Sequence, residues 1–119
     1  MLAKKNRLNL SLKENSLIFQ KGESSFISSR FFLAYLRKNE EYLKAACLSP
    51  KAIFKTAAAR NEHRRLLYSF LEKEIAKTNF SLLHKNDLVV VIKRNPTKDK
   101  ALLESDFSEL IKKINAENL

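Results

Sequence analysis

Alternation of apolar and polar positions predicts three strands in the first half of the chain. The clearest is Arg30–Arg37, whose side chains would point in turn to the two faces of a sheet. A short strand or turn is expected at Ser24–Ser29, and a third strand at Tyr42–Leu48. Because only the charged turn Lys38–Glu41 separates the second strand from the third, we expect these two to pair as an antiparallel hairpin.

Apolar residues at helical spacing mark three further segments. The first is Leu8–Phe19, with an expected start at Asn9 or Ser11 and an end at Gly22, the only glycine of the chain. A central helix is expected to run to about Lys77.

After the central helix the pattern predicts a buried strand, Asp87–Lys93, then a loop around Pro96 and a final helix. We expect this helix to be capped by Asp106, with Glu109 three residues on. Its apolar residues follow at helical spacing: Phe107, Leu110, Ile111 and Ile114.

The predicted order is helix, three strands, helix, strand, helix (αβββαβα), which is an α+β fold. It would have one sheet of about four strands with helices packed on one face. The third strand, the central helix and the fourth strand form a βαβ crossover, and such crossovers are right-handed in about 98% of cases. A chain of 119 residues with 45% hydrophobic content predicts a single domain, 1–119.

Composition narrows the function classes. The formal charge is +10, with 23 basic and 13 acidic residues and a pI near 9.9, so we expect a polyanionic partner. Nucleic acid is the first expectation and an anionic membrane surface the second. The single cysteine, Cys47, excludes an internal disulfide and fits a reducing cytoplasm. No apolar run reaches the length of a membrane span, and the first residues do not read as a signal peptide.

The central helix carries the strongest candidate site. At about 100° per residue, one arc of roughly 140° gathers three guanidinium groups, one amide and one phenol. These belong to Arg60, Asn61, Arg64, Arg65 and Tyr68. The opposite side is an apolar stripe that must face a core, made of Ala59, Leu66, Leu67, Phe70 and Leu71.

Guanidinium groups suit phosphate because each presents a planar fork of donors that stays charged near neutral pH. Upstream, Lys51 and Lys55 extend the positive field, and Ala57–Ala59 would let a phosphate backbone approach closely. The alternative is a solvated charged face. Such faces usually alternate acids with bases, whereas Glu62 is the only acid between Lys44 and Arg65, so we favour an anion-binding surface.

At these residues the sequence resembles the protein subunit of bacterial ribonuclease P. Members carry a loop of the type Ser-Lys-Lys, a spacer, and Arg-Asn-Arg-x-Lys-Arg ahead of a leucine-rich helix. The corresponding run here is Ser49-Pro50-Lys51, a longer spacer, and Arg60-Asn61-Glu62-His63-Arg64-Arg65. Glu62 replaces the middle arginine and Pro50 replaces one lysine. Beyond this run the resemblance covers Arg7 to Ile114 by element order and scattered apolar matches.

Each face of the second strand carries aromatic rings, and pattern alone leaves open which face is exposed. Phe31, Leu33 and Tyr35 would share one face, and Phe32, Ala34 and Leu36 the other. One set would pack in the core, while the other could stack on the bases of a single strand.

The resemblance implies functions for these surfaces. The family holds the 5′ leader of precursor tRNA between its first helix and the sheet, and the matching positions are Phe19, Phe31 and Tyr35. The basic arc, with Lys51 and Lys55, would bind the catalytic RNA. The resemblance also implies a left-handed crossover, and a monomeric protein in a ribonucleoprotein whose RNA, with Mg²⁺, cleaves the precursor. The protein would then supply no catalytic residue and bind no cofactor of its own.

The sequence gives little support for a metal site, a nucleotide-binding loop or a catalytic nucleophile. Cys47, His63 and His84 are too scattered for a zinc motif, and one glycine excludes a P-loop. A Cys47–histidine nucleophilic pair is disfavoured because Cys47 is expected to be buried. Three alternatives stay open: a general RNA-binding or ribosome-associated protein of the same fold, a DNA-binding regulator that reads the major groove with the central helix, and a free-standing nuclease.

Overall fold

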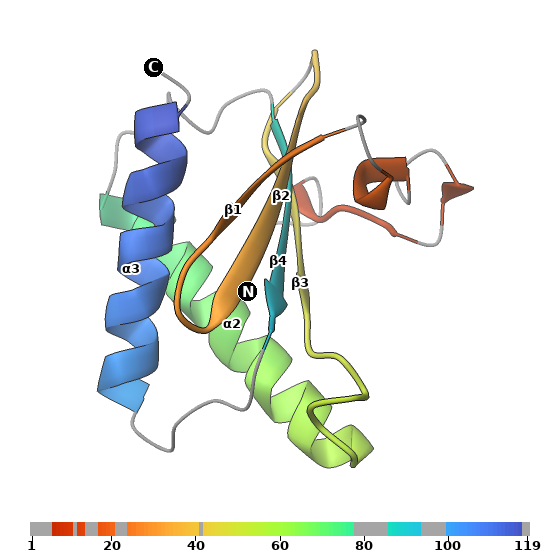
Figure 1. The fold of residues 1–119 in the computed structure, drawn as a ribbon, viewed down its shortest axis with the longest axis vertical. Helices are drawn as coiled ribbons and strands as arrows, with labels where there is room; N and C mark the ends of the chain where they lie inside the picture. The colour runs from red at the N-terminus through yellow and green to blue at the C-terminus, as the bar shows by residue number, and fades with distance from the viewer. Residues whose placement is uncertain are drawn as a thin grey trace.

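A computed structural model describes residues 6–10, 12–13, 17–20, 24–40, 42–77, 86–93 and 100–117 (Figure 1). Its strands are β1 (Ser25–Ser28), β2 (Phe32–Lys38), β3 (Lys44–Leu48) and β4 (Asn86–Ile92). Its helices are the 3-10 turn η2 (Leu17–Phe19), α2 (Ala57–Lys77) and α3 (Lys100–Glu117). The predicted α+β class is confirmed, and each predicted strand is present with no end shifted by more than two residues.

The strands form one sheet in the order β1-β2-β4-β3, so the predicted β2–β3 hairpin is wrong. Strand β4 lies between them, antiparallel to β2 and parallel to β3. The physical reason is burial: β4 is apolar on both faces and needs a central position, whereas proximity in sequence favoured only the short turn. The antiparallel hairpin of this fold is β1–β2.

The β3–α2–β4 segment is the predicted βαβ crossover, because β3 and β4 are parallel neighbours and α2 connects them. Its handedness stays a prediction from the family resemblance.

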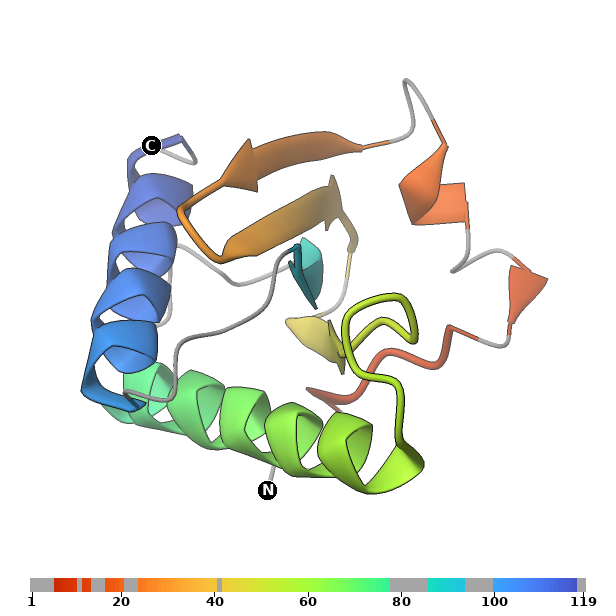
Figure 2. The ribbon, with the colours of Figure 1, turned by 60° about the horizontal axis from the view of Figure 1, so that its bottom comes forward.

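Both α-helices lie on one side of the sheet, and residues 6–10, 12–13 and 17–20 (the N-terminal segment) lie on the other (Figures 1 and 2). The larger core fills the helix side. Phe107 of α3 is fully buried there, with its ring 5.5 Å from that of Phe32 on β2 and 5.8 Å from that of Phe70 on α2. Among the described residues, neither helix is apolar and long enough to cross a membrane.

Helix α3 begins six residues before the predicted cap, which places Asp106 in mid-helix. Its carboxylate instead accepts hydrogen bonds from the turn between β1 and β2. The donors are Ser29 Oγ at 2.8 Å, the Phe31 backbone N–H at 2.9 Å and the Arg30 backbone N–H at 3.3 Å. An aspartate that precedes apolar residues at helical spacing resembles an N-cap in the sequence. Here its carboxylate binds a turn that is distant in the sequence, and not the start of its own helix.

The N-terminal segment differs from the predicted helix at its start, because Leu10 and Leu12 are not helical although the helix was expected to begin at Asn9 or Ser11. Arg7 forms an isolated parallel bridge with Ala45 of β3, and the Leu8 N–H donates to the Ala45 carbonyl at 2.9 Å. Leu8 therefore belongs to an extended stretch that adds to the edge of the sheet. The predicted helix end at Gly22 and the loop at Pro96 lie outside the described residues.

Candidate nucleic-acid interface

Helix α2 is fixed to the core by one face and by a cap at its first turn. Leu67, Phe70 and Leu71 are buried, which confirms the predicted apolar stripe at its centre. The hydroxyl of Thr56 accepts the Ala59 N–H at 3.2 Å, which satisfies one backbone donor of the helix start. The opposite face of α2 is therefore held in a defined orientation toward solvent.

Most of the predicted basic arc lies on that solvent face. Asn61, Arg64 and Arg65 are exposed, and Arg64 Nη2 donates to the side-chain oxygen of Asn61. Arg60 is half-buried, and its Nη1 donates to the Phe54 carbonyl at 2.9 Å. Arg60 thus also ties the preceding loop to the helix.

The loop between β3 and α2 is anchored by its one buried ring. Phe54 stacks on the imidazole of His63, with 4.2 Å between ring centroids. The Ala59 carbonyl accepts a hydrogen bond from His63 Nδ1 at 2.9 Å. Because a carbonyl oxygen can only accept, Nδ1 is a protonated ring nitrogen in this bond. Lys51 and Lys55 are exposed on either side of Phe54, so the predicted basic loop is presented beside the arc.

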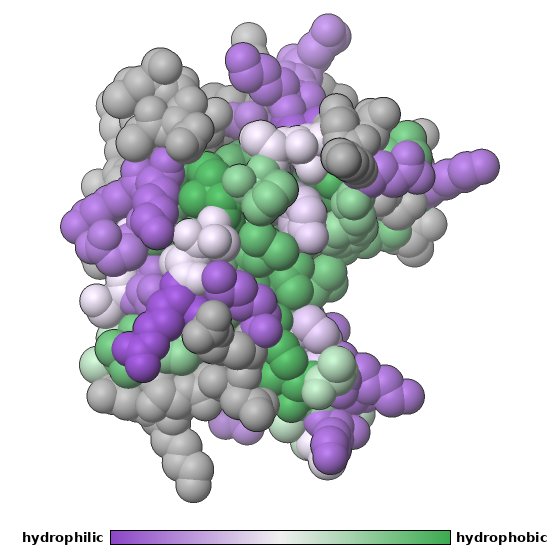
Figure 3. All heavy atoms as spheres, viewed as in Figure 1, coloured by the Kyte–Doolittle hydropathy of each residue, from purple (hydrophilic) through white to green (hydrophobic). Residues whose placement is uncertain are grey.

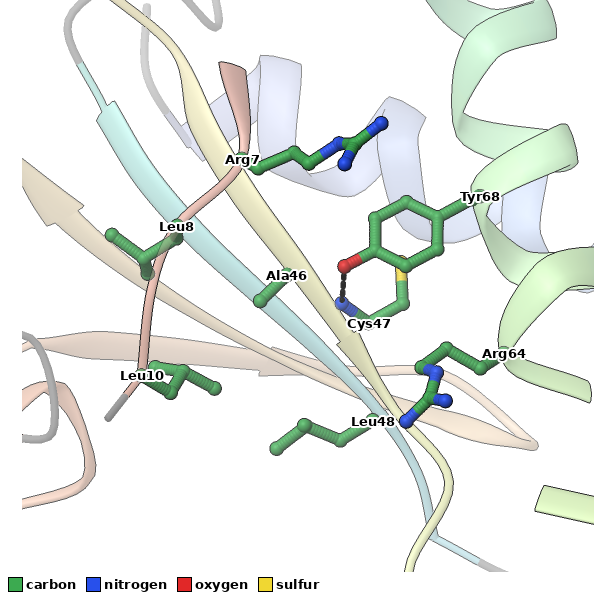
Figure 4. A pocket seen from close by; sticks show the side chains of 8 residues that line it. All are labelled: Arg7, Leu8, Leu10, Ala46, Cys47, Leu48, Arg64 and Tyr68. Carbon is green, nitrogen blue, oxygen red and sulfur yellow. Dashed lines mark hydrogen bonds between the residues drawn. The ribbon is translucent and has the colours of Figure 1, made fainter. Parts of the chain in front are cut away.

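Tyr68, the last residue of the arc, faces the edge of the sheet. Its hydroxyl accepts the Cys47 backbone N–H at 3.3 Å (Figure 4). Burial raises the pKa of Tyr68, against the opposing effects of the bond from Cys47 and of the nearby Arg64 and Arg7. Burial also raises the pKa of the Cys47 thiol to about 12, so this thiol is protonated and unreactive at neutral pH.

A cleft of about 310 Å³ lies beside Tyr68 and joins two surfaces of the molecule. Arg64 and Tyr68 of the arc line it on one side. Leu10 of the N-terminal segment and Leu48 of β3 line it as well, and both belong to the face of the sheet opposite α2 and α3, the helix-free face. The remaining lining residues are Arg7, Leu8, Ala46 and Cys47.

The helix-free face of the sheet carries an aromatic group at its β1–β2 end. The ring of Tyr35 lies 5.1 Å from that of Phe19 and 6.5 Å from that of Phe26. Phe19 is 41% exposed and Phe26 is 69% exposed, so both rings are accessible. The predicted neighbours Phe19 and Tyr35 are therefore brought together.

Phe31 does not join them. It is 5% exposed and belongs to the large core on the helix side, so its predicted place beside Tyr35 is wrong. The alternation of β2 begins only at Phe32, whereas Phe31 lies in the turn that Asp106 holds. Its ring also lies 5.0 Å below the Arg30 guanidinium.

The sequence analysis missed Phe26. It pairs with Tyr35 in the antiparallel register of β1 and β2, which puts both side chains on one face. The sequence does show an aromatic residue within a serine-rich strand. It does not show the register between β1 and β2, which decides the face of the sheet on which the Phe26 side chain lies.

Apolar side chains gather between hydrophilic margins on the surface seen in Figure 3, which is indented between the N-terminal segment and the β3–α2 loop. Beneath the N-terminal segment, Leu8 and Ile18 bury Val89 and Ala46. Leu33, Leu48 and Val91 stay half-buried in the same face.

The described residues contain no group of three or more His, Cys, Asp or Glu side chains that could hold a metal ion.

Fold and site together define a class: a small basic α+β protein in which a cationic helix arc and a helix-free sheet face meet at one cleft. Residues 2–115 match the model of the Ribonuclease P family, and the chain belongs to this family. Membership supports a role in an endoribonuclease complex that processes tRNA, in association with the ribonuclease P RNA. No curated protein sequence matches the chain.

Solved structures agree with this fold. The RNase P protein of Staphylococcus aureus is 17% identical, with a TM-score of 0.70, and the match covers 90% of this chain and 93% of that one. The RNase P protein of Thermotoga maritima is 21% identical, with a TM-score of 0.67, and the match covers 90% and 96%. A Staphylococcus aureus mutant protein with defective mRNA degradation activity matches at 16% identity, with a TM-score of 0.71, over 92% and 87%.

Proposed function

We propose that this chain is the protein subunit of ribonuclease P. In this proposal the α2 arc binds the catalytic RNA, and the helix-free sheet face holds the 5′ leader of precursor tRNA. The observation that carries it is the cleft, because Arg64 and Tyr68 of the arc line it together with Leu10 and Leu48 of the sheet face. One RNA complex could therefore contact both surfaces without a gap between them.

The arc would act by neutralising phosphates. Arg64 and Arg65 are exposed and each can bind two phosphate oxygens, while Lys51 and Lys55 add charge from the loop. Asn61 holds Arg64 by a hydrogen bond, which reduces the side-chain freedom that binding would remove. Arg60 contributes part of its charge and positions the loop.

The aromatic group would act by stacking. Phe19, Phe26 and Tyr35 present ring surfaces on which the bases of a single strand can lie, each worth about 1 to 3 kcal/mol. Such stacking tolerates any base, as a leader of variable sequence requires.

The RNA subunit with Mg²⁺ supplies the cleavage chemistry in this proposal. The chain's own residues lower phosphate repulsion and orient the leader relative to the cleavage site. No residue of the protein acts on the scissile bond.

The experiment is cleavage of a precursor tRNA at low Mg²⁺ by a bacterial ribonuclease P RNA, with and without the protein. We expect the mixture to remove the leader, the protein alone to remove none, and the complex to bind precursor more tightly than mature tRNA. If the protein binds the RNA but neither restores cleavage nor prefers the precursor, it is a general RNA-binding protein of this fold.

The arc is tested by the double variant Arg64→Ala/Arg65→Ala. The slope of log affinity against log salt for the catalytic RNA should shrink by about 2 if each arginine neutralises one phosphate. The control is Lys112→Ala/Lys113→Ala, which removes the same charge from exposed positions on α3. Equal effects of the two double variants would contradict the assignment of the arc.

A further inference from the structure

The 310 Å³ cleft lies where three separate parts of the chain meet. Arg7 and Leu10 come from the N-terminal segment, Leu48 from the end of β3, and Arg64 and Tyr68 from α2. The proposed function takes this cleft only as the place where two RNA-binding surfaces meet, and assigns it no ligand of its own. The cleft itself, with the N-terminal residues, is a site that the basic arc and the aromatic group do not include.

The lining combines apolar walls with two positive charges. Leu8 and Ala46 are buried at the back, while Leu10 and Leu48 are half-buried along one side (Figure 4). The Arg7 and Arg64 guanidinium groups lie on either side of the Tyr68 ring in the same view. An inorganic ion would gain nothing from the apolar walls, and a purely apolar ligand would gain nothing from two guanidinium groups.

The Tyr68 ring is a rigid wall because its hydroxyl is bonded to the Cys47 N–H. That bond, together with the Leu8 bond to the Ala45 carbonyl, also occupies backbone groups on the outer edge of β3. An extended peptide would need such groups to add as a further strand. The cleft is therefore better suited to a planar ligand that stacks than to a peptide.

Size sets a further limit. A volume of about 310 Å³ is at the lower end of small-molecule sites, which span about 300 to 1,000 Å³. It has room for a single nucleotide-sized group and not for a stretch of stacked strand.

We propose that the cleft binds one unstacked nucleotide of the RNA. Its base would lie against Tyr68 and the Leu10–Leu48 side, near Arg64, and its phosphate would be held by Arg7 at the opposite edge of the Tyr68 ring. Base-specific recognition of RNA commonly targets such unstacked nucleotides, whose π-face and edges are free. This inference rests on the proposed function, since it takes the RNA to be bound along the arc.

The first experiment titrates 5′-nucleoside monophosphates into the ¹⁵N-labelled full chain. We expect saturable shifts of the Leu10, Cys47 and Leu48 amides with a dissociation constant in the millimolar range. Inorganic phosphate and ribose 5-phosphate serve as probes without a base, and we expect them to leave these three amides nearly unchanged. If they reproduce the full shift, or if the monophosphates produce none, the cleft is not a nucleotide site.

Variants separate this inference from the function on which it rests. Arg7→Ala should weaken monophosphate binding several-fold and lower affinity for the catalytic RNA, whereas the matched N-terminal change Lys13→Ala should leave monophosphate binding unchanged. Lys13 is exposed and does not line the cleft. If Arg65→Ala weakens RNA binding while Arg7→Ala does not, the arc stands and the cleft proposal fails. If neither variant affects RNA binding, the proposed function fails as well.

Discussion

The two faces of the sheet use similar residues for different ends. On the helix side, Phe32, Ala34 and Leu36 of β2 are 0–5% exposed and pack beneath α2 and α3. On the other side, Leu33 and Tyr35 of the same strand stay half-buried. A covered face stabilises the fold, whereas an incompletely covered face retains apolar surface that another molecule can bury. Function is therefore expected where burial is partial, not where the strand is most apolar.

The largest expected effect is a difference in stability between two variants, each with one substitution on one face of the sheet. Phe107→Ala empties a fully buried site between Phe32 and Phe70, and should lower the free energy of unfolding by about 3 to 5 kcal/mol. Phe26→Ala removes a ring that is 69% exposed and should cost within about 0.5 kcal/mol. Urea unfolding measures both, and similar losses would mean that the open face is part of the core.

The next effect concerns the turn that joins β1 to β2. Asp106→Ala removes the acceptor of three hydrogen bonds from residues 29–31 and should cost about 2 kcal/mol, because bonds to a charged group are the stronger kind. Glu109→Ala is the control on α3, since it loses an exposed pair with Lys112 worth about 0 to 1 kcal/mol. Equal thermal stabilities of the two variants would show that Asp106 does not hold the turn.

Binding to the open face gives the third effect. Phe26→Ala should weaken precursor tRNA binding by about 1 to 3 kcal/mol, the contribution of one stacked base, and leave mature tRNA binding unchanged. Leu102→Ala removes a partly exposed apolar side chain from α3, on the other side of the molecule, and should change neither. Loss of affinity for both tRNAs in the Phe26 variant would place the ring outside the leader path.

The last effect is absent at neutral pH, because it is an alkaline pH dependence of stability that comes from the buried thiol. In the unfolded chain Cys47 ionises above its ordinary pKa of 9.0, while in the native state it holds its proton up to about 12. The stability it contributes is complete below pH 9 and falls as pH rises toward 12, by about 1 kcal/mol for each pH unit. Cys47→Ala should show a shallower alkaline decline than the parent chain, and parallel declines would rule out this linkage.

Local patterns predicted the elements, because strand alternation and helix periodicity depend on neighbouring residues. They failed where a residue's partner is distant. Strand β4 separates β2 from β3, and Asp106 binds a turn more than 70 positions away. The residues that neighbour β4 and Asp106 in the sequence do not indicate these long-range pairings.

The candidate site likewise has a part that local spacing predicts and a part that depends on distant pairing. The arc on α2 follows from spacing within one helix, and Asn61, Arg64 and Arg65 are exposed as predicted. The sheet surface depends on register between strands, so Phe31 was placed on the wrong face and Phe26 was missed. The part played by Arg7 depended on a bridge to β3 that no local pattern indicates.

The central place of β4 constrains the order in which this protein can assemble during synthesis. Until residues 86–92 have left the ribosome, β2 has only β1 beside it and β3 lacks the strand that pairs with it, so α2 has only part of a sheet to pack on. The arc of α2 thus reaches its final orientation only after about three-quarters of the chain has been made. A nascent chain stopped before β4 would carry the cationic helix but no fixed surface on which to present it.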